Sequence, residues 1–278
     1  NFNLFKKLLQ KGSIGFAESY MDGDFKTDNL SNLLLFAKQN ELSYLKKKQA
    51  KFFYDLFIKA SHHLNKNTKQ GSKKNISYHY DLGNDFYKHW LDRSMTYSSG
   101  IFENNNNDLE KAQIKKYKGI VEPLRLNDKS KILEIGCGWG GFSTFVAKEY
   151  GTKVRAITIS KQQFNFVAQK IFHEGLNEKI KVEMCDYRDI EDKYDNIVSI
   201  EMFEAVGKKY WKEFFEKIKN SLSSSGSATM QIITIDDSNA ENYQKNPDFI
   251  QQYIFPGGVL PSKMQLKTLT NSTGLQFN

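Results

Sequence analysis

The pattern of apolar and polar positions changes character near residue 131. From there to the end, short apolar runs alternate with stretches of helical periodicity. The apolar runs are 131–135, 154–159, 180–185, 195–200 and 228–235, and the helical stretches between or after them are 140–150, 161–174, 208–222 and 262–273. Buried strands separated by helices of this length form a parallel sheet with helices on both faces. The pattern therefore predicts an α/β fold with a Rossmann-like sheet.

The chain before this sheet has a different pattern. Residues 1–70 are lysine-rich and mostly helical, with one apolar stripe at 30–37 and a second at 52–60. Ordinary packing against a core explains both stripes, and so does a helix face that rests on lipid headgroups. Residues 64–75 are polar and basic, which predicts a linker. Residues 71–125 are helical and rich in aromatic side chains, so we expect three parts: 1–70, 71–125 and 126–278.

Composition and charge narrow the class of protein. The net charge is +8, which fits either a solvated lysine-rich surface or attraction to a polyanion such as an anionic membrane. The lysines are not interleaved with aromatics in a nucleic-acid-binding motif, so we expect no nucleic-acid partner. Cys137 and Cys185 have no metal-ligand or redox spacing, which predicts no metal site and a reducing, cytoplasmic setting. No apolar run is long enough to cross a bilayer.

The strongest local motif is LEIGCGWGGF at 133–142, which follows a strand and opens a helix. Gly136 and Gly138 permit a tight turn and a close approach of the backbone to a ligand, and ligands of such sheets bind at the carboxyl ends of the strands. A dinucleotide site needs an acid about 20 residues later, whereas the next strand ends at Ser160 without one. This argues against a dehydrogenase. An acid, Glu134, instead precedes the first glycine, an arrangement that resembles the first motif of class I methyltransferases, which bind S-adenosylmethionine.

The third strand ends at Asp186. Its carboxylate is a candidate acceptor for the adenine amino group of the cofactor. An aspartate that caps a loop or a helix explains the same position.

Eight segments in a fixed order resemble one family. They are HYDLGNDFY (79–87), LD (91–92), MTYSS (95–99), EIGCGWGG (134–141), TIS (158–160), DYRD (186–189), MFE (202–204) and YIFPGG (253–258). Together they are similar to the cyclopropane-fatty-acyl-phospholipid synthases and the related mycolic acid cyclopropane synthases. The similarity runs from about Gly12 to the end of the chain. A sheet of this kind normally adds two closing strands after the last helix, so we expect the natural C-terminus to lie beyond Asn278.

The resemblance implies roles for individual residues. Cofactor contacts would come from Gly136 and Gly138 in the turn, and from Tyr97, Ser98, Glu134, Thr158, Gln163 and Asp186. Glu204 would lie beside the reacting centre, where family members bind bicarbonate, and Tyr80 would line the same pocket. Residues 253–261 would shape an acyl channel. The implied partner is an unsaturated phospholipid at the inner face of the membrane, and a homodimer is compatible with the sequence.

Three positions differ from many relatives. Ser99 stands where they carry a cysteine, and Gln231 and Ala205 where they carry a histidine. The Ser99 and Gln231 side chains still hydrogen-bond an anion, so they stay candidate catalytic residues, but bicarbonate binding is left open. Methyl transfer to an acyl-chain double bond is therefore the leading function, with a cyclopropane ring as the expected product.

Three alternatives stay open. The same fold supports a methyl-branched product, or methyl transfer to a small amine or phenol. A lipid-binding module without catalysis is the third alternative.

Overall fold

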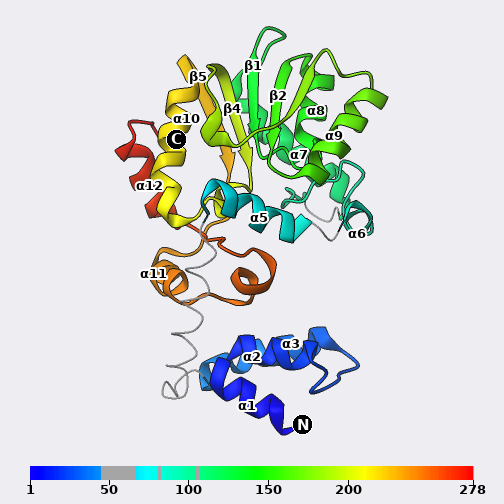
Figure 1. Ribbon diagram of the computed structural model, residues 1–278, viewed down its shortest axis with the longest axis vertical. Coiled ribbons are helices and arrows are strands. Elements are labelled where there is room, and N and C mark those ends of the chain that lie inside the picture. The colour runs from blue at the N-terminus through cyan, green and yellow to red at the C-terminus, as the bar shows by residue number, and fades with distance from the viewer. Residues whose placement is uncertain (45–66, 81–82, 104–106, 278) are drawn as a thin grey trace. The chain divides into compact units, whose positions relative to one another are not determined.

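The computed structural model describes residues 1–44, 67–80, 83–103 and 107–277, but not the side chains of 41–44, Lys74 and 77–80 (Figure 1). The apolar stripe at 52–60 lies outside these residues. The chain forms two compact units, one of residues 1–66 and 241–257, the other of 67–240 and 258–278. The expected division at residues 70 and 125 stays a prediction.

The second unit contains a sheet of five parallel strands in the order β3-β2-β1-β4-β5. The strands are β1 (Lys131–Ile135), β2 (Lys153–Thr158), β3 (Ile180–Met184), β4 (Tyr194–Ile200) and β5 (Leu222–Gln231). The neighbouring strands β1 and β4 are almost fully buried, as expected for a sheet covered on both faces. This confirms the predicted fold class.

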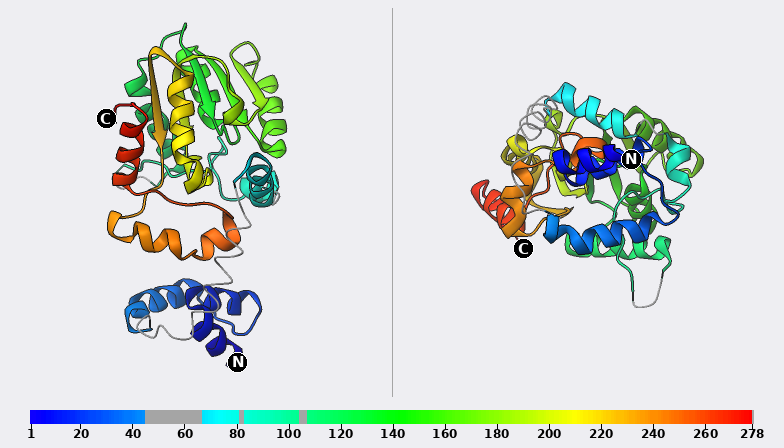
Figure 2. Two further views of the ribbon diagram at one scale, coloured as in Figure 1. Left: turned by 60° about the vertical axis from the view of Figure 1, so that its left-hand side comes forward. Right: turned by 90° about the horizontal axis from the view of Figure 1, so that it is seen from below.

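Helices cover the sheet because each parallel connection needs a crossover. α8 (Gly141–Tyr150) and α9 (Lys161–His173) connect strands that run outward from β1 toward β3, whereas α10 (Trp211–Ser221) connects β4 to β5 in the opposite direction. Right-handed crossovers therefore place α10 on the other face from α8 and α9 (Figure 1). α12 (Lys263–Ser272) contacts α10, which also lies along β5 (Figure 2).

Two helices before β1 complete the covering of the sheet. α7 (Leu109–Val121) begins after Asp108, whose side chain accepts the amide of Lys111, and it ends in a 3-10 turn, η1 (Glu122–Leu124). Its apolar face joins one core cluster with β1, β4 and α8. The short α6 (Asn84–Lys88) brings aromatic side chains toward the turn after β1.

The described residues of the first unit are mostly helical. α1 (Phe2–Lys11) packs on α2 (Ser13–Met21), and Lys7 forms ion pairs of 2.6 Å with both Asp22 and Asp24. α3 (Leu30–Tyr44) follows. Much later in the chain, the unit takes in α11 (Asp237–Lys245) from residue 241 onward and the π-helix η5 (Ile250–Ile254). The hydroxyl of Tyr253 donates to Glu18 at 2.7 Å, which joins η5 to α2 within this unit.

The predicted linker at 64–75 includes the boundary between the two units, after residue 66. It also contains the start of a helix, α5 (Lys69–Tyr80), because the hydroxyl of Thr68 accepts the amide of Gly71 and caps it. The prediction of the last strand was wrong at both ends, since the strand begins at Leu222 rather than 228 and ends at Gln231 rather than 235. Its first half is polar and includes a register shift opposite 194–196, so it has no apolar pattern to reveal it.

Candidate active site

The turn after β1 lies at the carboxyl end of the sheet, where ligands of such folds bind. Gly136 and Gly138 have φ of 78° and 53°, values that favour glycine. A Cβ on Gly136 would lie 2.7 Å from Cγ of Met202, whereas a Cβ on Gly138 would meet no described atom within 4 Å. The turn at Gly138 thus exposes bare backbone on which a cofactor can lie.

Glu134 lies directly before this turn and is fully buried. Its carboxylate accepts a hydrogen bond from the hydroxyl of Ser143 on α8. Burial raises the pKa of Glu134 to about 8, although Ser143 and the positive charges of Lys170 and Lys116 oppose the shift. The side chain therefore fixes the first turn of α8 against β1, and its predicted cofactor contact stays a prediction.

Thr158 and Gln163 lie together at the end of the neighbouring strand β2. The hydroxyl of Thr158 donates to Oε1 of Gln163 at 2.8 Å and accepts the amide of Ser160 at 3.1 Å. Ser160 caps α9 by accepting the amide of Gln163. Both side chains are buried polar groups at the carboxyl edge, a suitable place to hold the polar parts of a cofactor.

Asp186 follows β3 and is paired with Arg188. Arg188 donates to both carboxylate oxygens, at 2.8 and 2.7 Å, and its amide also donates to Oδ1. Burial alone would raise the pKa of Asp186, but these hydrogen bonds outweigh it and the pKa lies below its usual value. The capping role is present in the structure, and a carboxylate has further lone pairs for an adenine amino group.

Aromatic side chains from before β1 pack on the glycine turn. Trp139 lies in the turn, donates from Nε1 to Asn84 at 2.8 Å, and has its ring 4.7 Å from that of Tyr87. The Tyr97 ring lies 5.4 Å from Tyr87 and 5.2 Å from Trp90. Burial and the negative charge of Glu201 raise the pKa of Tyr97, so its hydroxyl stays neutral.

Ser98 is held from α7. Its hydroxyl accepts a hydrogen bond from Nζ of Lys116, and its carbonyl accepts one from Gln113 at 2.8 Å. Lys116 is buried, which lowers its pKa to about 8 even though Glu201, Asp92 and Glu134 favour its charged form. Lys116 was not predicted as a site residue, because a lysine in a helical pattern gives no sign that it points inward.

Ser99 and Gln231 come together around a third residue, Glu201. Oε1 of Glu201 accepts from the amide and hydroxyl of Ser99 at 3.0 and 2.9 Å, and from Nε2 of Gln231 at 2.7 Å. Nε2 of Gln231 also lies 2.8 Å from the Ser99 hydroxyl. Ser99 and Gln231, both candidate site residues, therefore lie together, and the carboxylate between them was not predicted.

Glu204 lies three residues after Glu201, on the 3-10 turn η3 (Phe203–Ala205). One carboxylate oxygen, Oε1, accepts the amide of Ile233, and its carbonyl accepts the amide of Val259 at 2.9 Å. The other oxygen, Oε2, is buried without a hydrogen-bond partner among the described residues. Burial raises the pKa of Glu204 to about 7, and the charge of Glu201 acts in the same direction.

For two predicted features of the site, the structure describes no side-chain contact with Glu204. Tyr80 ends α5, but its side chain lies outside the described residues. The 253–261 segment is divided between the two units, and the described hydrogen bond of Tyr253 is made to Glu18. Both assignments stay predictions.

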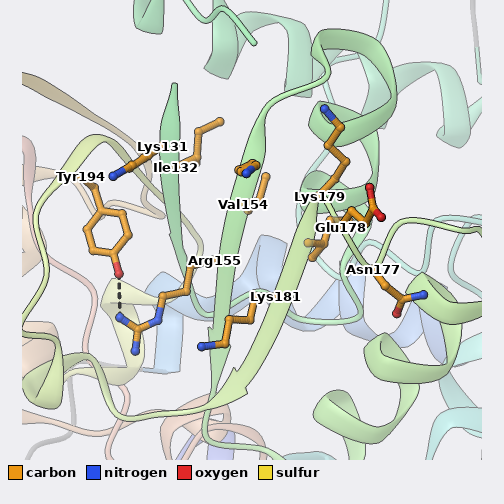
Figure 3. A pocket seen from close by; sticks show the side chains of 11 residues that line it. Lys131, Ile132, Val154, Arg155, Asn177, Glu178, Lys179, Lys181 and Tyr194 are labelled. Atoms are coloured by element: carbon orange, nitrogen blue, oxygen red, sulfur yellow. Dashed lines mark hydrogen bonds between the residues drawn. The ribbon is translucent and has the colours of Figure 1, made fainter. Parts of the chain in front are cut away.

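A shallow pocket lies at the opposite end of the sheet, around the amino ends of β1, β2 and β3 (Figure 3). Arg155 lines this pocket and donates to the hydroxyl of Tyr194 at 2.6 Å, and it forms ion pairs with Glu183 and Asp192. These contacts hold three strands together. The pocket is therefore a structural feature away from the carboxyl edge.

No group of three or more His, Cys, Asp or Glu side chains among the described residues is placed to hold a metal ion. Likewise, no helix in the described ranges has the length and hydropathy needed to cross a bilayer.

The parallel sheet with its order β3-β2-β1-β4-β5, the glycine turn after β1 and the polar pair after β2 define a class I S-adenosylmethionine-dependent methyltransferase. The model of the mycolic acid cyclopropane synthetase family matches residues 67–278. The chain therefore belongs to this family, which confirms the resemblance.

Individual relatives agree with this assignment. The chain is 36% identical over 270 residues to cyclopropane-fatty-acyl-phospholipid synthase of Escherichia coli K12, an alignment that covers 96% of this chain and 67% of the relative. It is 30% identical to the tuberculostearic acid methyltransferase UfaA1 of Mycobacterium tuberculosis H37Rv, over 99% of this chain and 66% of the relative. The chain thus spans about two thirds of the length of these relatives.

The structural comparison gives the same result. A crystal structure of mycolic acid cyclopropane synthase CmaA1, complexed with SAH and CTAB, superposes with a TM-score of 0.68 at 30% identity. The match covers 73% of this chain and 74% of that one.

Proposed function

We propose that this protein transfers a methyl group from S-adenosylmethionine to the double bond of an unsaturated phospholipid acyl chain, with closure to a cyclopropane ring. The observation that carries the proposal is Glu204, a half-buried carboxyl group whose Oε2 has no partner among the described residues, at the carboxyl edge of a methyltransferase sheet. The named activities of the relatives support the substrate.

The glycine turn and its surroundings fit the cofactor. The bare backbone at Gly138 would take the amino acid portion, and Thr158 and Gln163 would hold its polar groups. Asp186 would accept from the adenine, and Tyr97 and Ser98 would close the site from the aromatic segment. The cofactor supplies an electrophilic methyl group. The residues around it would stabilise the cation that forms, exclude water and accept a proton.

The protein's own side chains would manage the positive charge that methylation leaves on the acyl chain. Aromatic faces such as Tyr97 stabilise a cation by about 0.5–2 kcal/mol each, and they exclude water that would trap it as an alcohol. Glu204 would take a proton from the transferred methyl group, and the electron pair of that C–H bond would close the ring. Its pKa of about 7 suits a general base at neutral pH.

Access to the lipid would come from the first unit. Phe2, Phe5 and Leu9 share one face of α1 and are 90%, 60% and 68% exposed. Lys6 is exposed on the same helix, and the chain carries a net charge of +8. An amphipathic helix with these features binds an anionic membrane surface from the cytoplasmic side, without spanning it.

A methyl-branched product is the second candidate. The similarity to tuberculostearic acid methyltransferase UfaA1 favours it. In this outcome the same cation would lose a proton from a neighbouring carbon, and a double bond would remain.

Mass spectrometry of fatty acids from cells that express the full-length protein and lack their own cyclopropane synthase tests the proposal. We expect a gain of one CH2 unit in unsaturated chains and loss of the double bond. A gain of CH2 with a surviving double bond supports the branched product. Cofactor binding without mass change in any lipid would contradict methyl transfer and leave a lipid-binding module.

A further inference from the structure

The site contains a carboxylate whose place is fixed by three donors. Oε1 of Glu201 accepts from the amide of Ser99 at 3.0 Å, from its hydroxyl at 2.9 Å and from Nε2 of Gln231 at 2.7 Å. These groups come from three segments, the end of the aromatic region, the end of β4 and the end of β5. Such convergence of donors on one oxygen is the arrangement of an anion site.

The backbone of Glu201 adopts a strained conformation where its carboxylate meets these donors. Its φ is 48°, in the left-handed region that a glutamate rarely adopts. The amide of Glu201 donates to the carbonyl of Gln231 at 2.8 Å, which anchors the residue beside β5 while its side chain reaches Ser99. Strained residues concentrate at functional sites, where the surrounding structure holds them.

The occupied donors decide whether bicarbonate fits. A second anion at Ser99 and Gln231 would find the donors already used and would meet the negative charge of Glu201 within a few ångströms. The residues present therefore do not fit bicarbonate at this position.

We propose that the carboxylate of Glu201 is the anion of this active site, so that the protein works without bicarbonate. This inference rests on the proposed function, in which a cation forms on the acyl chain. The negative charge of Glu201 raises the pKa of both Tyr97 and Glu204, and the same charge would stabilise a cation that forms in this site. It would do so without taking the proton itself.

Direct binding of 13C-bicarbonate, followed by NMR, tests the anion site whether or not the lipid reaction occurs. We expect no saturable binding to the full-length wild-type protein and saturable binding to Glu201→Gly, whose smaller residue suits the backbone angle and vacates the donors. Arg125→Gly is the matched control, because Arg125 also has a positive φ of 49° and follows η1, with no site role. It should behave as wild type. Binding of bicarbonate to the wild type would overturn the proposal.

Activity gives the second test. Wild-type methyl transfer should be unchanged in buffer stripped of dissolved carbon dioxide, and added bicarbonate should restore the activity that Glu201→Gly loses. Glu201→Gln keeps the shape but removes the charge, so we expect kcat to fall about 10²-fold. Its pH profile should also shift to lower pH, because the charge that raises the pKa of Glu204 is gone. Full activity of Glu201→Gln, or failure of bicarbonate to rescue a folded Glu201→Gly, would overturn the proposal.

The binding and activity experiments distinguish failure of the proposed function from failure of the proposed role of Glu201. A wild-type protein that modifies no lipid contradicts the proposed function but leaves the bicarbonate-binding result readable. A wild-type protein that modifies lipid only when bicarbonate is present contradicts the role of Glu201 alone.

Discussion

Glu204 shows how one side chain combines burial with availability. The amide of Ile233 fixes one oxygen, and the other oxygen is left without a partner among the described groups. Burial raises its pKa to about 7, so protonated and ionised forms are both present near neutral pH. A carboxyl group in this state accepts a proton from substrate and returns it to solvent at little cost.

Replacement of Glu204 by glutamine should remove the base while preserving its shape. We expect kcat for lipid methylation to fall about 10²–10⁴-fold, with little change in S-adenosylhomocysteine affinity measured by calorimetry. Wild-type activity should rise with pH through about 7, because the ionised form is the active one. Glu213→Gln on the exposed face of α10 is the control and should match wild type. An active Glu204→Gln enzyme would refute this role.

Burial of Glu134 predicts how the free energy of unfolding depends on pH. Its pKa is raised from 4.5 to about 8 in the folded state, so the folded protein binds a proton more tightly than the unfolded chain. The contribution of this group to the free energy of unfolding is therefore fully present below about pH 4.5 and is lost as pH rises through about 8.

Urea unfolding of wild type and Glu134→Gln near pH 5 and near pH 9 measures this contribution. We expect the wild type to lose more stability than the variant over this interval. Lys116 and Lys170 titrate in both proteins, so their effects largely cancel in the difference. Equal pH dependence in the two proteins would show that Glu134 does not carry the effect.

At the scale of elements, a substitution in the turn between β1 and α8 should weaken cofactor binding in addition to its cost to folding. Gly138→Ala places a methyl group where no described atom lies within 4 Å, so the main cost to folding is the positive φ, about 1–2 kcal/mol. The same methyl group would obstruct the cofactor, and we expect its affinity to fall about tenfold or more.

Gly175→Ala is a matched control for this variant. Gly175 has a φ of 66° and open space around its Cβ position, but it lies at the end of α9, at the opposite end of that helix from the carboxyl edge. Similar loss of thermal stability with unchanged cofactor affinity is expected. Equal loss of affinity in both variants would mean that strain, rather than obstruction, weakens binding.

The elements of the sheet were largely predictable, whereas the site was predictable only in part. β1 was predicted to the residue, because its apolar run is bounded by charged and glycine residues. The first six of the ten residues of β5 were missed, because its serines give no burial signal. Ser99 and Gln231 were identified from the family pattern, but Glu201 was not. A glutamate in the sequence does not reveal a φ of 48°, and only the folded backbone brings its carboxylate to donors 102 and 30 positions away.

At the scale of the whole molecule, membrane attachment is the property to test. Phe5→Ser with Leu9→Ser should reduce binding to anionic phospholipid vesicles at least about tenfold in a sedimentation assay, since each buried apolar side chain contributes about 1.5–3 kcal/mol. Added salt should weaken binding of the wild type, because the lysines act through screened charges.

Phe172→Ser provides the control for membrane binding. Phe172 is 69% exposed on α9, far along the chain from α1. Its replacement should leave vesicle binding unchanged. A loss equal to that of the α1 variant would locate the membrane contact elsewhere.

The first unit joins two segments that lie far apart in the sequence, 1–66 and 241–257, and this governs its order of folding. Glu18 and its partner Tyr253 are 235 positions apart. A ribosome that adds about 5–20 residues per second needs roughly 10–50 s to make the second after the first. During translation α2 therefore cannot complete this contact until all five described strands of the sheet have been synthesised.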